Sequence, residues 1–153
     1  MGSAISKRNF YGYAAEEIVR ADLAKKEIVS LSPDIPWTHY DMVADIGGSF
    51  VKIQVKTKMS HDGYRMIIDN RKSNGASRPY TESDYDVLAI VDLENRRVAY
   101  LPFEVWQGRS QISIMLREVV DMNGYGRGKQ PLYFSDYSEF PVIGRNESKE
   151  ASA

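Results

Sequence analysis

The sequence predicts an α/β fold, and three stretches carry that prediction. Residues 9–26 contain many good helix formers, with no glycine or proline after Tyr13, and therefore predict a helix. Residues 40–46 and 50–58 alternate apolar with polar side chains around a Gly-Gly-Ser turn, which predicts a β-hairpin. Residues 85–92 are almost continuously apolar, as is typical of a central strand covered on both faces.

The remaining segments are expected to extend this core. We expect further strands at residues 27–31, 64–69 and 97–101, a short helix at 103–108, loops at 32–36, 70–79 and 123–129, and a last segment near 140–143. A turn at residues 61–63 predicts that strand 64–69 pairs with the hairpin, and strand 97–101 is expected to run antiparallel to 85–92. Residues 112–120 fit a strand or a helix equally well.

Composition limits the class of protein. A chain of 153 residues, with 42% hydrophobic and 27% charged residues, predicts one soluble globular domain. We expect a flexible segment at 1–8, the domain at 9–145 and a disordered tail at 146–153. The absence of cysteine excludes disulfides and thiolate metal sites. Without a membrane-length apolar run or a signal-peptide core, the chain is expected to be intracellular and cytoplasmic, with no membrane partner.

Charge is distributed unevenly, although the net charge is only −1. Residues 52–78 contain seven basic side chains and two acidic ones, whereas residues 79–104 contain six acidic side chains and two arginines. A polarised molecule of this kind can bind a polyanion on one side. Lysines on solvated strand edges would explain the same pattern, so charge leaves both interpretations open.

The second hairpin strand has a polar face that suggests chemistry. Because side chains alternate along a strand, Gln54 and Lys56 share one face, while Val51, Ile53 and Val55 face the core. The first hairpin strand can bring Asp41 or Asp45 to this face across the turn. An acid, a second oxygen ligand and a lysine are the groups that metal-assisted hydrolysis of a phosphodiester requires.

A fourth candidate, Glu16, lies in the N-terminal helix. It shares a helix face with Gly12, Val19 and Leu23, where a carboxylate is unfavourable unless a cation compensates it. A metal ion or a catalytic lysine would provide that compensation. Alternatively, Glu16 borders the core with its carboxylate in water.

Four sequence blocks in this order resemble a known family. The blocks are Asn9-Phe10-Tyr11-Gly12 with Ala15-Glu16; Tyr40-Asp41-Met42-Val43 with Asp45; Ile53-Gln54-Val55-Lys56-Thr57; and Tyr85-Asp86-Val87-Leu88-Ala89, continuing to Val98 and Tyr100-Leu101-Pro102. Over residues 9–105 they resemble the PD-(D/E)xK nuclease superfamily, in particular its group I intron-encoded homing endonucleases. The resemblance implies a restriction-endonuclease-like core, a central mixed β-sheet flanked by helices, and Mg²⁺-dependent, sequence-specific cleavage of double-stranded DNA.

The resemblance also implies roles for single residues. Asp41 matches the metal-binding acid, and Gln54 matches the second metal ligand, which is Asp or Glu in most of the superfamily. Lys56 matches the lysine that orients the attacking water or stabilises the transition state, and Glu16 matches the helix-borne acid that completes the metal site. Mg²⁺ prefers oxygen ligands and retains several waters. Mn²⁺ is expected to substitute, and no small-molecule cofactor is implied.

DNA is the expected partner. We expect DNA contacts from the basic side chains that follow the hairpin or lie in the C-terminal loop: Lys58, Arg65, Arg71, Lys72, Arg78, Arg127 and Lys129. Because one active site cuts one strand, the resemblance further implies a dimer or tetramer acting at a long, near-palindromic target.

Several alternatives remain at this point. Pro33-Asp34 is the literal proline–aspartate pair, but it lies in a proline-bracketed loop, so Asp41 is preferred. His39 and His61 lack the companions of a histidine-based nuclease site, and both tryptophans, Trp37 and Trp106, are expected to pack in the core. A Holliday-junction resolvase shares the helix acid and the hairpin. A catalytically silent DNA-binding module would explain the neutral Gln54.

Overall fold

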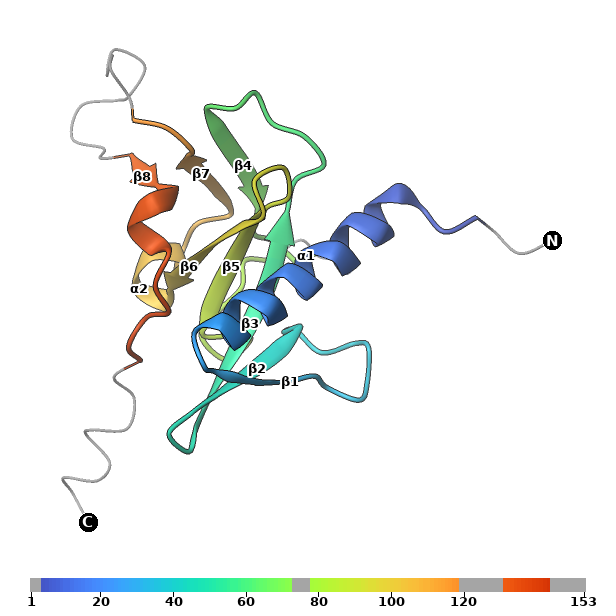
Figure 1. Ribbon diagram of the computed structural model, residues 1–153, viewed down its shortest axis with the longest axis vertical. Helices are drawn as coiled ribbons and strands as arrows, with labels where there is room; N and C mark the ends of the chain where they lie inside the picture. Colours follow the sequence, from blue (N-terminus) through green and yellow to red (C-terminus); the bar gives the residue numbers. More distant parts are fainter. Residues whose placement is uncertain (1–3, 73–77, 119–130, 144–153) are drawn as a thin grey trace.

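A computed structural model describes residues 4–72, 78–118 and 131–143. Within them, a five-stranded mixed sheet and a three-stranded sheet combine with short and long helices (Figure 1). The elements are α1 (Lys7–Lys25), β1 (Val29–Leu31), β2 (Met42–Ile46), β3 (Ser49–Thr57), β4 (Arg65–Asp69), β5 (Val87–Asp92), β6 (Arg97–Pro102), α2 (Phe103–Trp106), β7 (Gln111–Met115), β8 (Leu132–Tyr133) and the 3₁₀ helix η1 (Phe134–Tyr137). No helix among these residues is long and apolar enough to cross a membrane.

Helix α1 begins two residues before the predicted start. The Ser6 hydroxyl accepts a hydrogen bond from the Asn9 backbone N–H at 3.3 Å and thereby caps the first turn. Ala15, Val19 and Leu23 recur at intervals of four residues, are fully buried, and attach the helix to the central sheet. The residues that face water, such as Glu17, lie on the opposite side of the helix.

The central sheet has the order β1-β2-β3-β5-β6, and β3 and β5 are its parallel pair. The predicted hairpin is confirmed: Met42 lies opposite Ile53, and Gly47 and Gly48 form the turn with φ values of +59° and +88°. Glycine suits that turn because positive φ is unfavourable for other residues. Strand β5 is buried at every position, as its apolar run predicts.

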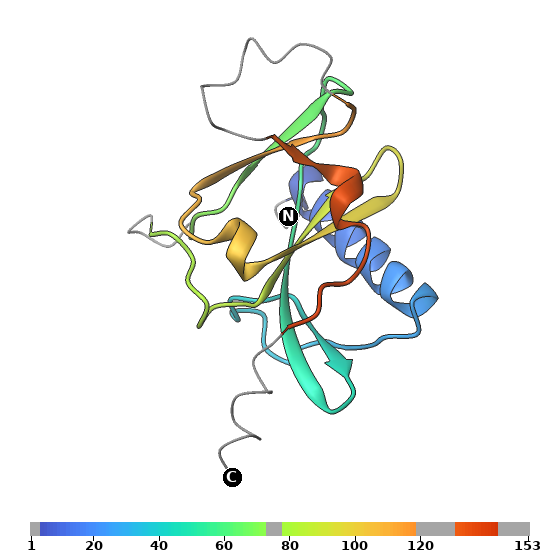
Figure 2. The ribbon, with the colours of Figure 1, turned by 90° about the vertical axis from the view of Figure 1, so that its left-hand side faces the viewer.

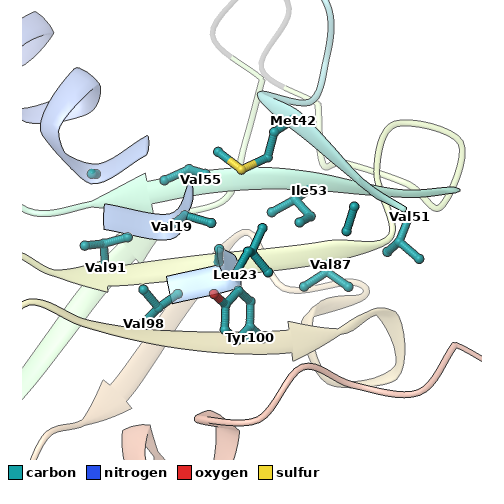
Figure 3. Packing of buried hydrophobic residues seen from close by; sticks show 13 residues of the cluster. Val19, Leu23, Met42, Val51, Ile53, Val55, Val87, Val91, Val98 and Tyr100 are labelled. Atoms are coloured by element: carbon teal, nitrogen blue, oxygen red, sulfur yellow. The ribbon is translucent and has the colours of Figure 1, made fainter. Parts of the chain in front are cut away.

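Two apolar clusters cover the two faces of this sheet. On one face, α1 packs on alternate residues of β2, β3, β5 and β6, such as Met42, Ile53 and Val87 (Figure 3). On the other face, Leu88 and Ile90 of β5 pack against the second sheet and α2, which lie on the side of the molecule away from α1 (Figure 2). The polar face of β3, with Gln54 and Lys56, is the face that points away from α1.

The predicted pairing of residues 64–69 with the hairpin is wrong. Strand β4 instead pairs with β7 in a separate sheet of order β4-β7-β8. The reason is competition for hydrogen-bonding edges, because β3 already pairs with β2 on one side and with β5 on the other. The open question about residues 112–120 is answered in part, since residues 111–115 form strand β7.

One of the two tryptophans contradicts its prediction. Trp106 is fully buried and donates its indole N–H to the Asp86 carbonyl at 3.1 Å. Trp37, in contrast, is 73% exposed. It lies in the loop between β1 and β2, outside the strands of the central sheet.

Candidate active site

Asp41 lies where β2 begins, at the edge of β3. Its backbone N–H donates to the Ile53 carbonyl at 2.8 Å, and its Oδ2 accepts the Val55 N–H at 2.7 Å. The carboxylate therefore accepts a β3 hydrogen bond that a backbone carbonyl would accept if β2 were longer. The other oxygen, Oδ1, accepts no hydrogen bond from a described residue and remains available to a ligand.

Gln54 and Lys56 follow on the polar face of β3. The Gln54 Nε2 donates weakly to the Val55 carbonyl at 3.5 Å. The Gln54 Oε1 accepts no hydrogen bond from the described residues. Lys56 is partly buried, and this desolvation lowers its pKa, while the nearby charges of Asp41 and Asp69 oppose the shift. The lysine therefore stands close to the Asp41 carboxylate.

Glu16 approaches the same place from α1. Partial burial raises the Glu16 pKa, and the negative charge of Asp41 raises it further. Burial also raises the pKa of Asp41, against the opposing effects of the Val55 N–H and Lys56. A cation bound near these two carboxylates would stabilise their ionised forms. Asp41 is therefore within electrostatic range of both Glu16 and Lys56, and Gln54 lies on the same face of β3 as Lys56.

The sequence around this constellation decides the family. A family model of PD-(D/E)XK endonucleases matches residues 7–139, which include all four residues.

The chain belongs to the PD-(D/E)XK endonuclease family.

The fold supports this membership. The chain resembles the solved structure of a bacterial homing endonuclease, I-Ssp6803I, with a TM-score of 0.60 and 23% sequence identity, over 79% of this chain and 81% of that one. At this identity the likeness concerns the fold, which confirms the predicted endonuclease-like core with its central mixed sheet. No curated protein sequence matches the chain.

The donor set of this nuclease fits a hard divalent cation. Two carboxylates and one amide oxygen are the ligand types that Mg²⁺ binds, usually together with water. No group of three His, Cys, Asp or Glu side chains that could hold a metal exists in the described part of the chain. Glu16 and Asp41 are only two carboxylates, and the third candidate ligand, Gln54, is a neutral amide.

The basic residues predicted to contact DNA fall into two groups. Lys58 and Arg65 are exposed and form no salt bridge within the described ranges. Arg71 pairs with Asp69 at 2.9 Å, whereas Lys72 and Arg78 both bind Asp84. Two further candidates, Arg127 and Lys129, lie outside the described residues.

Asp84 neutralises Lys72 and Arg78. This carboxylate is 3% exposed, lies 3.1 Å from both Lys72 Nζ and Arg78 Nη2, and accepts the Thr81 N–H at 2.8 Å. These hydrogen bonds and charges hold the pKa of Asp84 well below its usual range, although burial opposes them. The cluster ties residues 72 and 78 together at the base of the connection between β4 and β5.

Tyr80 is a neighbour of Lys56 that sequence reasoning missed. Its ring centroid lies 5.8 Å from Lys56 Nζ, and its other side contacts Tyr85 edge-on at 5.1 Å. Burial raises the Tyr80 pKa, and the Asp41 charge adds to the shift. An isolated aromatic in a polar segment has no periodicity, so no sequence signal identifies it.

Arg8 was also missed, although a signal exists. Its charge lowers the pKa of Lys56, so the two side chains lie near each other. Arg8 precedes Gly12 and Glu16 by four and eight residues, and this spacing places all three on one helix face. Assigning residues 1–8 to a flexible segment concealed that pattern.

The competing candidates have other partners. Asp45 Oδ1 accepts the Gly48 N–H at 3.3 Å within the hairpin turn, and Asp34 is exposed in the loop after β1. His61 binds Asp92 through Nε2 at 3.0 Å and accepts the Gly63 N–H on Nδ1 at 3.0 Å. His39 lies 3.0 Å from Lys72 Nζ and away from His61. The two histidines therefore do not form one site.

Proposed function

We propose that this chain is a Mg²⁺-dependent homing endonuclease that hydrolyses phosphodiester bonds at a long, near-palindromic double-stranded DNA sequence. The observation that carries the proposal is that Asp41, which is hydrogen-bonded to β3, lies near both Glu16 and Lys56, while Gln54 shares the Lys56 face of β3. Membership of an endonuclease family supports the reaction class. The fold likeness to a bacterial homing endonuclease supports the kind of target.

Asp41, Gln54 and Glu16 would hold the metal through their oxygen atoms. When bound, Mg²⁺ supplies positive charge to the scissile phosphate and lowers the pKa of a coordinated water. The free Oδ1 of Asp41 and the free Oε1 of Gln54 support this assignment. Mn²⁺, which also binds oxygen ligands, is expected to substitute for Mg²⁺.

Lys56 orients the attacking water or stabilises the charge that gathers on the phosphate. Its ammonium group is partly buried beside Tyr80, where a charge acts more strongly than it does in bulk water. Desolvation lowers the pKa of Lys56, whereas the charge of Asp41 raises it and so favours the charged ammonium form.

The decisive experiment is Mg²⁺-dependent cleavage of a randomised double-stranded DNA library. Lys56→Ala and Asp41→Asn should each reduce cleavage by about 100-fold or more while DNA binding persists. Lys52→Ala and Asp45→Asn are matched controls, because they change the same residue types on the same strands but bind Ser83 and Gly48 instead. Cuts should cluster at one motif.

The same experiment separates the alternatives. Preferential cutting of a four-way junction over linear duplex would replace the proposal with a resolvase. DNA binding without any cutting, in the presence of Mg²⁺ or Mn²⁺, would indicate a catalytically silent binding module. Equal losses of activity in Lys52→Ala and Lys56→Ala would place the chemistry elsewhere.

The neutral ligand Gln54 leads to a separate prediction about metal affinity. Because an amide attracts a cation less than a carboxylate does, the free protein should bind Mg²⁺ weakly, and Gln54→Glu should bind it more tightly. Isothermal calorimetry without DNA measures both affinities. Tight Mg²⁺ binding by the unchanged protein would contradict the assignment of Gln54 as a metal ligand.

We further propose that copies of the chain associate as a dimer or tetramer. The proposed place of action is the cytoplasm of a prokaryotic or phage-infected cell. One active site cuts one strand, so double-strand cleavage at a near-palindrome needs two copies. Val29 and Phe50, which are 60% and 64% exposed at the uncovered end of the central sheet, offer apolar surface for such contacts. Sedimentation at several protein concentrations tests this; a monomer at all concentrations, with or without DNA, contradicts it.

A further inference from the structure

A groove extends from the candidate active site along α1. It has a volume of about 540 Å³ and runs between the first turns of α1, the end of β3 and the end of β4. Its charged lining residues are four cations, Arg8, Lys56, Lys58 and Arg71, and one carboxylate, Asp69. Lys56 belongs to both the groove and the active site, so the two are continuous.

The cations of the groove differ in whether a described residue neutralises them. Arg71 neutralises Asp69 through a bidentate contact at 2.9 Å. Arg8 and Lys58 form no salt bridge with any described residue, and both line the groove together with Lys56. Like charges that face one groove repel each other, and an anion in the groove would relieve the repulsion.

Gly12 is a second, independent indication of a ligand. It lies in the interior of α1, where only proline is less favourable than glycine for helix stability. A Cβ atom built on Gly12 would have nothing within 4 Å, so close packing inside the protein does not explain the residue. Gly12 lines the groove, one helical turn after Arg8 and one turn before Glu16.

We propose that this groove binds the sugar–phosphate backbone of the DNA strand next to the scissile phosphate. Arg8 and Lys58 contact its phosphates, and the missing side chain at Gly12 leaves room for the backbone to lie against α1. A phosphodiester chain fits because it supplies repeated negative charges along the groove. The inference rests on the proposed function for the identity of the ligand.

The first test fills the groove without changing its charge. Gly12→Leu should fold normally with an unchanged or higher melting temperature, because leucine is a better helix former than glycine. It should nevertheless weaken binding to a short labelled DNA duplex, measured by fluorescence anisotropy, by about 10-fold. Gly12→Ala is the matched control, with the same gain in helix propensity and a much smaller loss of binding.

The second test removes one charge. Binding is measured between about 50 and 200 mM salt, where each lost phosphate contact should reduce the slope of log affinity against log salt concentration by about 0.9. Arg8→Gln should show that reduction. Lys25→Gln, an exposed lysine in the last turn of the same helix, should leave the slope unchanged.

These outcomes distinguish the groove from the catalytic proposal. Reduced binding by Gly12→Leu and Arg8→Gln supports the groove whether or not the protein cuts the DNA. Unchanged binding by both variants, in a protein that cuts DNA in a Lys56-dependent manner, overturns the groove alone. If the unchanged protein neither binds nor cuts DNA at low salt, both proposals fall.

Discussion

Two basic clusters of the described chain differ in what neutralises them. In the groove along α1, Arg8 and Lys58 have no counter-charge among the described residues. In the segment between β4 and β5, Lys72 and Arg78 enclose the buried carboxylate of Asp84. Each cluster contributes two basic side chains, so composition alone does not distinguish them. A basic side chain is available to a polyanion only where it is not already paired with a buried carboxylate.

The largest effect is expected at Asp84. Asp84→Asn leaves Lys72 and Arg78 without their shared carboxylate, and breaking such a buried pairing should lower the free energy of unfolding by about 3 kcal/mol. Thermal or urea unfolding measures the loss. Asp34→Asn, in an exposed loop, is the control and should change stability little. Equal stability of the two variants would mean that Asp84 does not anchor this segment.

The same residue predicts a pH dependence. Because the folded-state pKa of Asp84 is depressed, its contribution to stability is complete above the unfolded-state value, about 3.9, and is lost as the pH falls toward the folded-state value. Unfolding free energies measured at decreasing pH should therefore converge for the unchanged protein and Asp84→Asn below about pH 4. A gap between the two that stays constant through this range would refute the contribution of Asp84 ionisation.

Tyr80 provides the next largest effect, because it connects the Asp84 segment to the active site. Tyr80→Leu should expose Lys56 and raise its pKa, since desolvation is the main cause that lowers it and a cation–π contact at 5.8 Å is weak. The alkaline limb of the pH–cleavage profile should move to higher pH, and cleavage at neutral pH should fall by about 10-fold.

Tyr80→Phe tests whether the ring or the hydroxyl matters. It keeps the aromatic ring over Lys56 and should preserve both the rate and the pH profile. Comparable losses in Tyr80→Phe and Tyr80→Leu, with the alkaline limb unmoved, would show that the ring does not set the environment of Lys56.

The smallest effect compares single lysines from the two clusters. Lys58→Ala should weaken DNA binding several-fold and reduce its salt slope by about 0.9, because one phosphate contact is lost. Lys72→Ala should leave the salt slope unchanged and lower the melting temperature, because its ammonium group is committed to Asp84. Anisotropy titrations and thermal unfolding of both variants measure the difference. A reduced salt slope in Lys72→Ala would remove the distinction between the clusters.

The sequence alone determined the elements whose pattern is local. The 3.6-residue and two-residue periods placed α1, the hairpin and β5, and they brought Gln54 and Lys56 to one face of β3. The placement of these elements succeeds because each side chain's direction depends on its own strand or helix. The roles of Asp41 and Glu16 came from the family resemblance and stay predictions.

The tertiary structure decided everything that depends on competition between distant groups. Strand β4 joined a second sheet because β5 had taken the free edge of β3, and Trp37 lies exposed in a loop outside the sheet. The pairing of Lys72 and Arg78 with Asp84, and the freedom of Arg8, likewise depend on which partners fold beside them. A sequence states which edges and charges a chain possesses, but packing and hydrogen bonding between distant segments choose among the possible partners.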